Sequence, residues 1–232
     1  MIITANVRTD TSRSVRARQL EAAFDVPPSE KQHLSWRVDA PVESRPWNIG
    51  AIIGPSGSGK TTLLREFGEP ADLDWQGAAV VDDFPAGLKL DEITAACSAV
   101  GFNTIPAWLR PYSVLSNGEQ FRATMARLLV SPGYSHQGDE RPIVIDEFTS
   151  VVDRQVAKIA SHAVAKYTRR QDRQLVVASC HYDIEDWLQP DWVIDPVHQT
   201  FRWREVSPRP KSQSRSQPAT MRSGAASLAF TI

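Results

Sequence analysis

The chain has 232 residues, of which 41% are hydrophobic and 23% are charged, so it is long enough to bury one sizeable core and is not fully disordered. The 26 basic and 27 acidic residues give a net charge of −1, which excludes a whole-molecule field that attracts nucleic acid or an anionic membrane. Two cysteines, Cys97 and Cys180, offer no disulfide framework, which favours a cytoplasmic location.

The first elements along the chain are a helix and a strand. Residues 1–19 resemble a transit peptide in composition, but they continue without a break into a helical stretch at 19–24. Alternating residues at 34–41 predict a strand of a small antiparallel lobe. No apolar run approaches the roughly 20 residues of a membrane-spanning helix, so we expect no membrane insertion.

The middle of the chain alternates short apolar runs with helical stretches. Runs at 49–54, 77–83, 141–147 and 174–180 predict parallel strands covered on both faces by helices, and the segments 191–195 and 201–205 predict a closing hairpin. The sequence therefore predicts an α/β fold with a mostly parallel sheet and crossover helices. Residues 207–232 are rich in Ser, Pro and basic residues without an acid, which predicts a disordered tail.

A glycine-rich loop follows the first of these runs. It satisfies the phosphate-loop pattern GxxxxGK[ST] between a strand and a helix. Its backbone N–H groups are expected to converge on phosphate oxygens, with Lys60 reaching the β and γ phosphates and the Thr61 hydroxyl binding Mg²⁺. The predicted ATP-binding residues are Gly54, Pro55, Ser56, Gly57, Ser58, Gly59, Lys60, Thr61 and Thr62.

Two adjacent carboxylates, Asp146 and Glu147, end the apolar run at 143–145. Burial of an unpaired charge is energetically costly, so a buried strand does not favour two adjacent acids. Ligands, however, bind beside the carboxyl ends of parallel strands. We expect Asp146 to hold Mg²⁺ and Glu147 to be the catalytic base that polarises the attacking water.

The string LSNGEQ at 115–120 precedes a helical run. Ser116 and Glu119 fit a capping box, so one interpretation is only a well-capped helix. The string is also similar to the LSGGQ signature of the ABC ATPases, whose motifs occur here in the family order over about residues 24–205. In this resemblance the loop and the acidic strand are Walker A and Walker B, residues 149–153 correspond to the D-loop, and His181 corresponds to the switch histidine.

The resemblance implies an ATP hydrolase that forms a head-to-tail homodimer with two ATP molecules at the interface. Ser116, Gly118, Glu119 and Asp153 would then contact the nucleotide of the opposite subunit, and His181 would join Glu147 as a catalytic residue. Residues 1–206 would form one ABC-type ATPase domain with a short helical lid at about 84–115, and it would drive an unidentified protein partner.

Three positions depart from the family pattern. Asn117 replaces a signature glycine, Phe148 stands where relatives usually have proline, and Asp82 occupies the expected place of the Q-loop glutamine. Asp82 is thus a further candidate metal ligand. Phe24 is a candidate for the aromatic residue that stacks on adenine.

The strings RPWNIG and DEFTSVVDRQVAK resemble soluble ABC-class ATPases of phages and bacterial mobile elements, some of which continue into an acetyltransferase-fold domain. Two alternatives stay open. One is the nucleotide-binding subunit of an ABC transporter, and the other is a DNA-associated ABC clamp, so binding to nucleic acid is left undecided.

Overall fold

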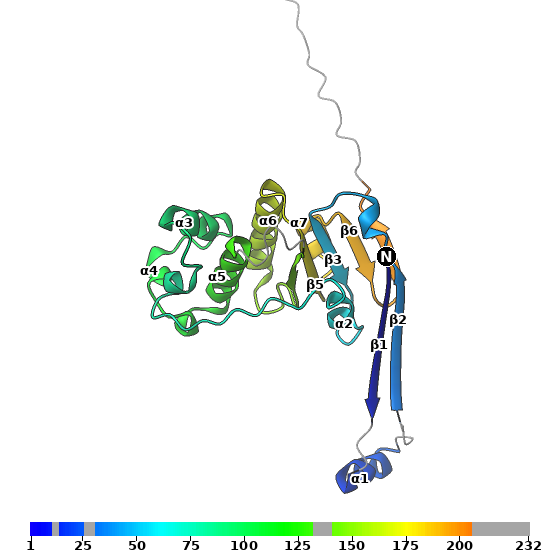
Figure 1. The fold of residues 1–232 in the computed structure, drawn as a ribbon. Helices are drawn as coiled ribbons and strands as arrows, with labels where there is room; N and C mark the ends of the chain where they lie inside the picture. The colour runs from blue at the N-terminus through cyan, green and yellow to red at the C-terminus, as the bar shows by residue number, and fades with distance from the viewer. Residues whose placement is uncertain (11–13, 26–30, 132–140, 206–232) are drawn as a thin grey trace, which may run out of the picture.

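The computed structural model describes residues 1–10, 14–25, 31–131 and 141–205, and its centre is a five-stranded sheet (Figure 1). The strand order is β4-β5-β3-β6-β7. The first four are parallel neighbours and β7 pairs antiparallel with β6. Their bounds are β3 (Ile49–Ile53), β4 (Ile143–Ile145), β5 (Leu175–Ser179), β6 (Trp192–Asp195) and β7 (Thr200–Trp203). The predicted α/β class and the closing hairpin are confirmed, and the predicted tail lies outside the described residues.

Both faces of the sheet are covered, which explains why its strands are apolar on consecutive residues. Ile49, Ala51 and Ile53 of β3 belong to one core cluster together with residues of α5 (Asn117–Val130), α6 (Arg154–Arg170) and α7 (Ile184–Leu188). Ile52, between them, belongs to a second cluster on the opposite face with residues of α2 (Lys60–Leu64) and of an N-terminal hairpin. In the described ranges, no helix is both long and apolar enough to cross a membrane.

The N-terminal hairpin is a separate two-stranded antiparallel sheet that projects from the main sheet (Figure 1). It joins β1 (Ile2–Asp10) to β2 (Lys31–Asp39), and α1 (Val15–Ala23) lies at its far end. The predicted helix and the predicted antiparallel strand are confirmed. The sequence analysis missed β1, although the alternation of Ile3, Ala5 and Val7 with polar residues is a strand signal.

A small helical subdomain occupies the predicted lid. It contains α3 (Leu90–Ala99), α4 (Ile105–Trp108) and the short 3₁₀ turn η3 (Tyr112–Val114). The indole N–H of Trp108 donates to the Phe102 carbonyl at 2.9 Å and closes the connection between α3 and α4. A further 3₁₀ turn, η1 (Val42–Ser44), links the hairpin to β3.

The strand predicted at 77–83 is wrong, because this segment forms the 3₁₀ turn η2 (Val80–Asp83). The Asp83 carboxylate accepts hydrogen bonds from the backbone N–H groups of Gln76 and Gly77, and the Asp82 carboxylate accepts one from Ala79. Such local bonds compete with extended pairing. The backbone beside β4 is instead that of Ala71, whose N–H donates to the Val144 carbonyl at 2.8 Å.

Candidate functional site

The glycine-rich loop connects the buried end of β3 to the start of α2. Gly57 and Gly59 have φ of +77° and +90°, the left-handed region in which glycine is favoured. A Cβ at Gly59 would lie 2.3 Å from the Trp36 ring, so the indole packs directly on the loop backbone. The Lys60 ammonium donates to the Pro55 carbonyl at 2.7 Å.

The loop and the start of α2 contain hydrogen-bond donors that α2 itself does not pair. The first N–H groups of any α-helix have no partner within the helix, and here they belong to Lys60, Thr61 and Thr62. Within the described part of the chain, the buried Ser58 hydroxyl also has no hydrogen-bond partner. Successive backbone N–H groups in such a turn form a concavity that suits an anion.

The Thr61 hydroxyl donates to the Asp146 carboxylate at 2.7 Å. This contact exists because β3 and β4 are parallel and both flank β5, so their carboxyl ends meet at one edge of the sheet. A hydroxyl and a carboxylate are hard oxygen ligands of the kind that Mg²⁺ takes from proteins, which usually supply only one or two of its ligands. No group of three or more His, Cys, Asp or Glu residues that suits a metal is found among the described residues.

Glu147 follows with a left-handed backbone, φ +48°. Its N–H donates to the Asp146 carboxylate at 2.8 Å, and its own exposed carboxylate accepts from the Ser150 hydroxyl at 3.4 Å. The backbone turn therefore directs two consecutive carboxylates to different places at the end of one strand.

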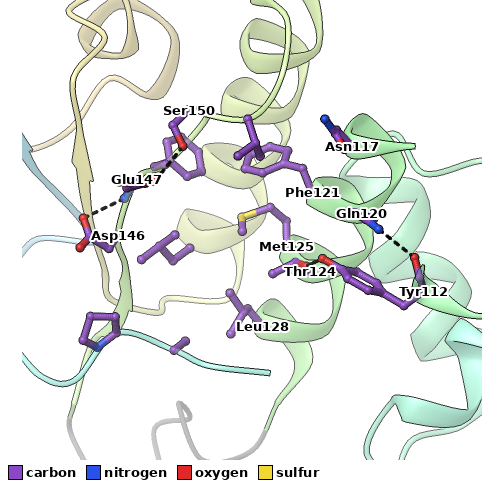
Figure 2. Close-up of a pocket in the computed structure, with 15 residues that line it drawn as sticks. Tyr112, Asn117, Gln120, Phe121, Thr124, Met125, Leu128, Asp146, Glu147 and Ser150 are labelled. Atoms are coloured by element: carbon purple, nitrogen blue, oxygen red, sulfur yellow. Dashed lines mark hydrogen bonds between the residues drawn. The ribbon is translucent and has the colours of Figure 1, made fainter. Parts of the chain in front are cut away.

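Two adjoining cavities share Asp146, Glu147 and Ser150. The loop cavity, of about 330 Å³, is also lined by Val7, Trp36, Ser56, Gly57, Gly59, Lys60, Thr61, Thr62 and Cys180. The helix cavity, of about 430 Å³, lies between these carboxylates and α5 (Figure 2). The structure thus brings the predicted loop residues and the predicted acidic pair to one place.

Sequence reasoning did not find Val7 and Trp36, which line the loop cavity from the hairpin. The hairpin pairs Ala5 with Trp36, and the alternation around Val7 was the available signal. Phe24, the predicted stacking residue, is 72% exposed beside α1 at the end of the hairpin and lines neither cavity.

Comparisons with known proteins were informative only for structure. No family model matches the chain, and no curated protein is significantly similar to it. A dimeric post-hydrolysis structure of the ATP-binding cassette MJ0796 bound to ADP and Pi matches with a TM-score of 0.53 and 13% identity, over 89% of this chain and 100% of that chain. A second dimeric structure of MJ0796, a bacterial ABC transporter cassette, matches with a TM-score of 0.51 and 14% identity, over 85% and 95%. The structure of cbiO1 from Clostridium perfringens, part of the ABC transporter complex cbiONQ, matches with a TM-score of 0.50 and 18% identity, over 67% and 75%.

The chain has the ABC-cassette fold. Identities of 18% or less establish the fold alone.

The segment predicted to be the signature motif begins α5. The Glu119 carboxylate accepts from the Ser116 hydroxyl at 2.7 Å and from its backbone N–H at 3.0 Å, which completes the predicted capping box. The Ser116 hydrogen bonds hold the pKa of Glu119 below its ordinary value. A Cβ at Gly118 would come no closer than 3.7 Å to its neighbours, so packing within this subunit does not require a glycine there. Ser116, Gly118 and Glu119 line neither cavity.

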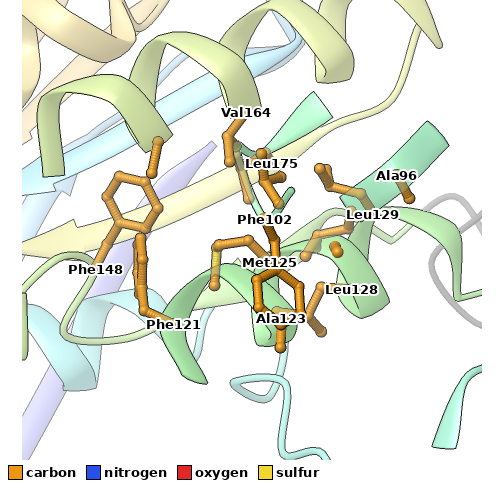
Figure 3. Packing of buried hydrophobic residues seen from close by; sticks show 14 of the residues in the cluster. Ala96, Phe102, Phe121, Ala123, Met125, Leu128, Leu129, Phe148, Val164 and Leu175 are labelled. Atoms are coloured by element: carbon orange, nitrogen blue, oxygen red, sulfur yellow. The ribbon is translucent and has the colours of Figure 1, made fainter. Parts of the chain in front are cut away.

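Phe148 connects the acidic strand to this helix. It is fully buried, and its ring lies 5.7 Å from that of Phe121 on α5 (Figure 3). Phe148 thus packs α5 against the loop that carries Glu147.

Asp153 and His181 lie near the site but line neither cavity. The Asp153 carboxylate accepts from the N–H groups of Gln155 and Val156 at 2.9 and 3.0 Å and caps α6. His181 follows β5, with its Nδ1 3.4 Å from the Thr149 hydroxyl. Asp82 is engaged in its own turn at Ala79 and also lines neither cavity, so the structure offers no support for its predicted metal role.

Proposed function

We propose that this chain is an ABC-type ATPase that binds and hydrolyses Mg-ATP and drives a partner protein. The observation that carries the proposal is the 2.7 Å contact between Thr61 of the phosphate loop and Asp146, with Glu147 beside it in the same cavity. A glycine-rich turn that merely fits a pattern would not need a carboxylate pair at its mouth, since unpaired acids there repel one another.

The loop would bind the triphosphate. The N–H groups at the start of α2 and the Lys60 ammonium would contact its oxygens, and the cation would replace its bond to the Pro55 carbonyl with a charge-assisted one. Val7 and Trp36 supply an apolar wall to the same cavity, which suits the nucleoside.

Thr61 and Asp146 would hold Mg²⁺, which neutralises charge on the phosphate oxygens when bound. Glu147 then acts as general base: it accepts a proton from the water whose oxygen attacks the γ-phosphorus, and the bond to the ADP oxygen breaks. Its exposed carboxylate is open to water on the shared side of the two cavities.

The catalytic unit would be a head-to-tail homodimer. Ser116, Gly118, Glu119 and Asp153 lie outside the cavities of their own subunit, and a partner's nucleotide would give the N-terminus of α5 an anion to bind. His181 would contact the same closed site. The solved MJ0796 cassettes are dimers by their own description, which supports this arrangement.

A transporter subunit is the second candidate function, because the similar solved structures are transporter cassettes. The short lid, with helices of 10 and four residues, argues for a free-standing ATPase instead. A DNA-associated clamp would be recognised by strongly salt-dependent DNA binding.

Glu147→Gln tests the proposal. The amide keeps the shape of the side chain but is not a base, so ATP hydrolysis is expected to fall about 100-fold or more while ATP binding survives. Light scattering with Mg-ATP should then detect twice the 25.8 kDa of one chain, because ATP that binds the dimer more tightly than the monomer stabilises the dimer by mass action.

Lys60→Ala is the control, since it should abolish ATP binding in a calorimetric titration. A Glu147→Gln protein that hydrolyses ATP at the wild-type rate, or a Lys60→Ala protein with unchanged affinity, would contradict the proposed ATPase.

A further inference from the structure

Two hydroxyl groups converge on one backbone carbonyl behind the acidic pair. The Phe148 carbonyl accepts from the Thr149 hydroxyl at 2.6 Å and from the Ser179 hydroxyl at 3.0 Å. The Ser179 hydroxyl in turn accepts from the backbone N–H of His181 at 3.1 Å. This network ties the loop after β4 to the turn after β5.

Thr149 has an unfavourable backbone conformation within this network. Its φ is +68°, which a β-branched residue rarely adopts, and its side chain is completely buried. Such strain persists only where the surrounding structure enforces it, and it is concentrated at functional sites. The burial leaves the Thr149 hydroxyl no water to exchange with, so its partners fix its orientation.

The hydrogen bonds of Thr149 determine the role of the neighbouring histidine. A hydroxyl has a single proton to donate, and the 2.6 Å contact assigns it to the Phe148 carbonyl. Towards His181 Nδ1, 3.4 Å away, the Thr149 oxygen is therefore an acceptor. We infer that Thr149 is a positioning residue that selects the tautomer of His181 with its proton on Nδ1.

This inference rests on the proposed function and deepens it. In the neutral ring, Nε2 then has a lone pair and accepts hydrogen bonds, for example from water. It donates to a phosphate oxygen only when the imidazole is protonated. Thr149 thus determines whether the neutral His181 meets the nucleotide as a donor or as an acceptor.

Another histidine supplies an internal reference. His198 Nδ1 lies 2.8 Å from the Asp195 carboxylate, and an ionised carboxylate only accepts hydrogen bonds, so this ring also carries its proton on Nδ1. The Asp195 contact does not involve Thr149. It should therefore be unaffected by substitutions there.

The experiment records long-range ¹H–¹⁵N correlations of the imidazoles in the full, ¹⁵N-labelled chain without nucleotide. The measurement is made at about pH 8, where imidazole is ordinarily neutral. His181 is assigned by the signals that disappear in His181→Gln. We expect its Nδ1 to be of the protonated type and its Nε2 of the unprotonated type.

Thr149→Val keeps the shape and β-branching but removes the hydroxyl, so His181 should shift towards the Nε2-protonated tautomer. Thr149→Ser keeps the hydroxyl and should keep the wild-type pattern, with His198 unchanged throughout. In steady-state ATPase assays, Thr149→Val should lower kcat about tenfold with KM for ATP unchanged, the scale of one hydrogen bond, and Thr149→Ser should restore it.

A wild-type His181 protonated on Nε2, or a Thr149→Val protein with an unchanged His181 pattern, would overturn the inference. If Thr149→Val does not fold, the wild-type tautomer decides alone. Because the spectra are recorded without nucleotide, a chain that proves inactive on ATP contradicts the proposed function and not the tautomer.

Discussion

At the scale of single residues, packing against Trp192 requires a glycine at position 50 of the central strand β3. A Cβ at Gly50 would lie 2.0 Å from the Trp192 ring. That ring is fully buried, stacked on Phe67 at 5.1 Å and in edge contact with Trp47 at 5.3 Å, so it has no space into which to move. Gly50 lies four residues before the phosphate loop begins at Gly54.

Gly50→Ala should lower the free energy of unfolding by about 1–3 kcal/mol, because the methyl group overpacks a rigid aromatic cluster. Urea denaturation followed by tryptophan fluorescence measures the loss. Gly57→Ala is the matched control: its methyl group meets open space, and only the backbone strain at φ +77° remains, of about 1 kcal/mol. Equal losses in the two variants would contradict this account.

The site was predictable from the sequence where its chemistry is local. The loop at 54–62 and the acids at 146–147 each follow a strand, and parallel pairing alone brings Thr61 to Asp146. Val7, Trp36 and the contact of Thr149 with His181 depend on tertiary packing between distant segments, which no local pattern encodes. The prediction of a strand at 77–83 was wrong because the carboxylates of Asp83 and Asp82 accept from the backbone N–H groups of Gly77 and Ala79.

At the scale of elements, α5 and α6 both begin with a side-chain cap at the edge of the site. Ser116 and Glu119 cap α5, and Asp153 caps α6 through two N–H groups. Capping fixes where each helix begins, and with it the position of the residues that precede it. The same side chains therefore have a measurable structural role apart from any contact with nucleotide.

Asp153→Ala should lower the free energy of unfolding by about 1 kcal/mol, because the N–H groups of Gln155 and Val156 lose their acceptor. Asp153→Ser retains an acceptor oxygen and should recover most of the loss. Thermal or urea denaturation of the two variants checks this. Identical stability of wild type and Asp153→Ala would mean that solvent replaces the cap without cost.

At the scale of the whole molecule, the proposed homodimer makes the site of each subunit one half of a working site. The phosphate loop and the N-terminus of α5 belong to different regions of one subunit, and the cavity of the loop contains no residue of the 116–119 segment. A substitution that prevents the two subunits from closing is therefore the most direct test of the proposed dimeric ATPase.

In the Glu147→Gln background, Ser116→Arg should prevent the ATP-dependent doubling of mass while ATP binding by the monomer persists, because a long cation displaces the α5 N-terminus from the partner's nucleotide. Light scattering and calorimetry measure the two effects. Ser116→Ala removes only the hydroxyl and leaves the backbone N–H groups at the start of α5, so dimerisation should weaken far less in that control than in Ser116→Arg. A Ser116→Arg protein that still doubles its mass would restrict Ser116 to capping.

The strand order has a further consequence, which concerns synthesis. β3 pairs with β5 from Leu175 and with β6 from Trp192, while its own residues, Ile49–Ile53, are made early. An apolar central strand therefore leaves the ribosome long before either neighbour exists, and non-local pairing of this kind folds slowly. The phosphate loop gains its full support from the sheet only after β6 has been made. Until then the nascent chain exposes a strand with two open edges, which makes chaperone binding or aggregation the main competitor of folding.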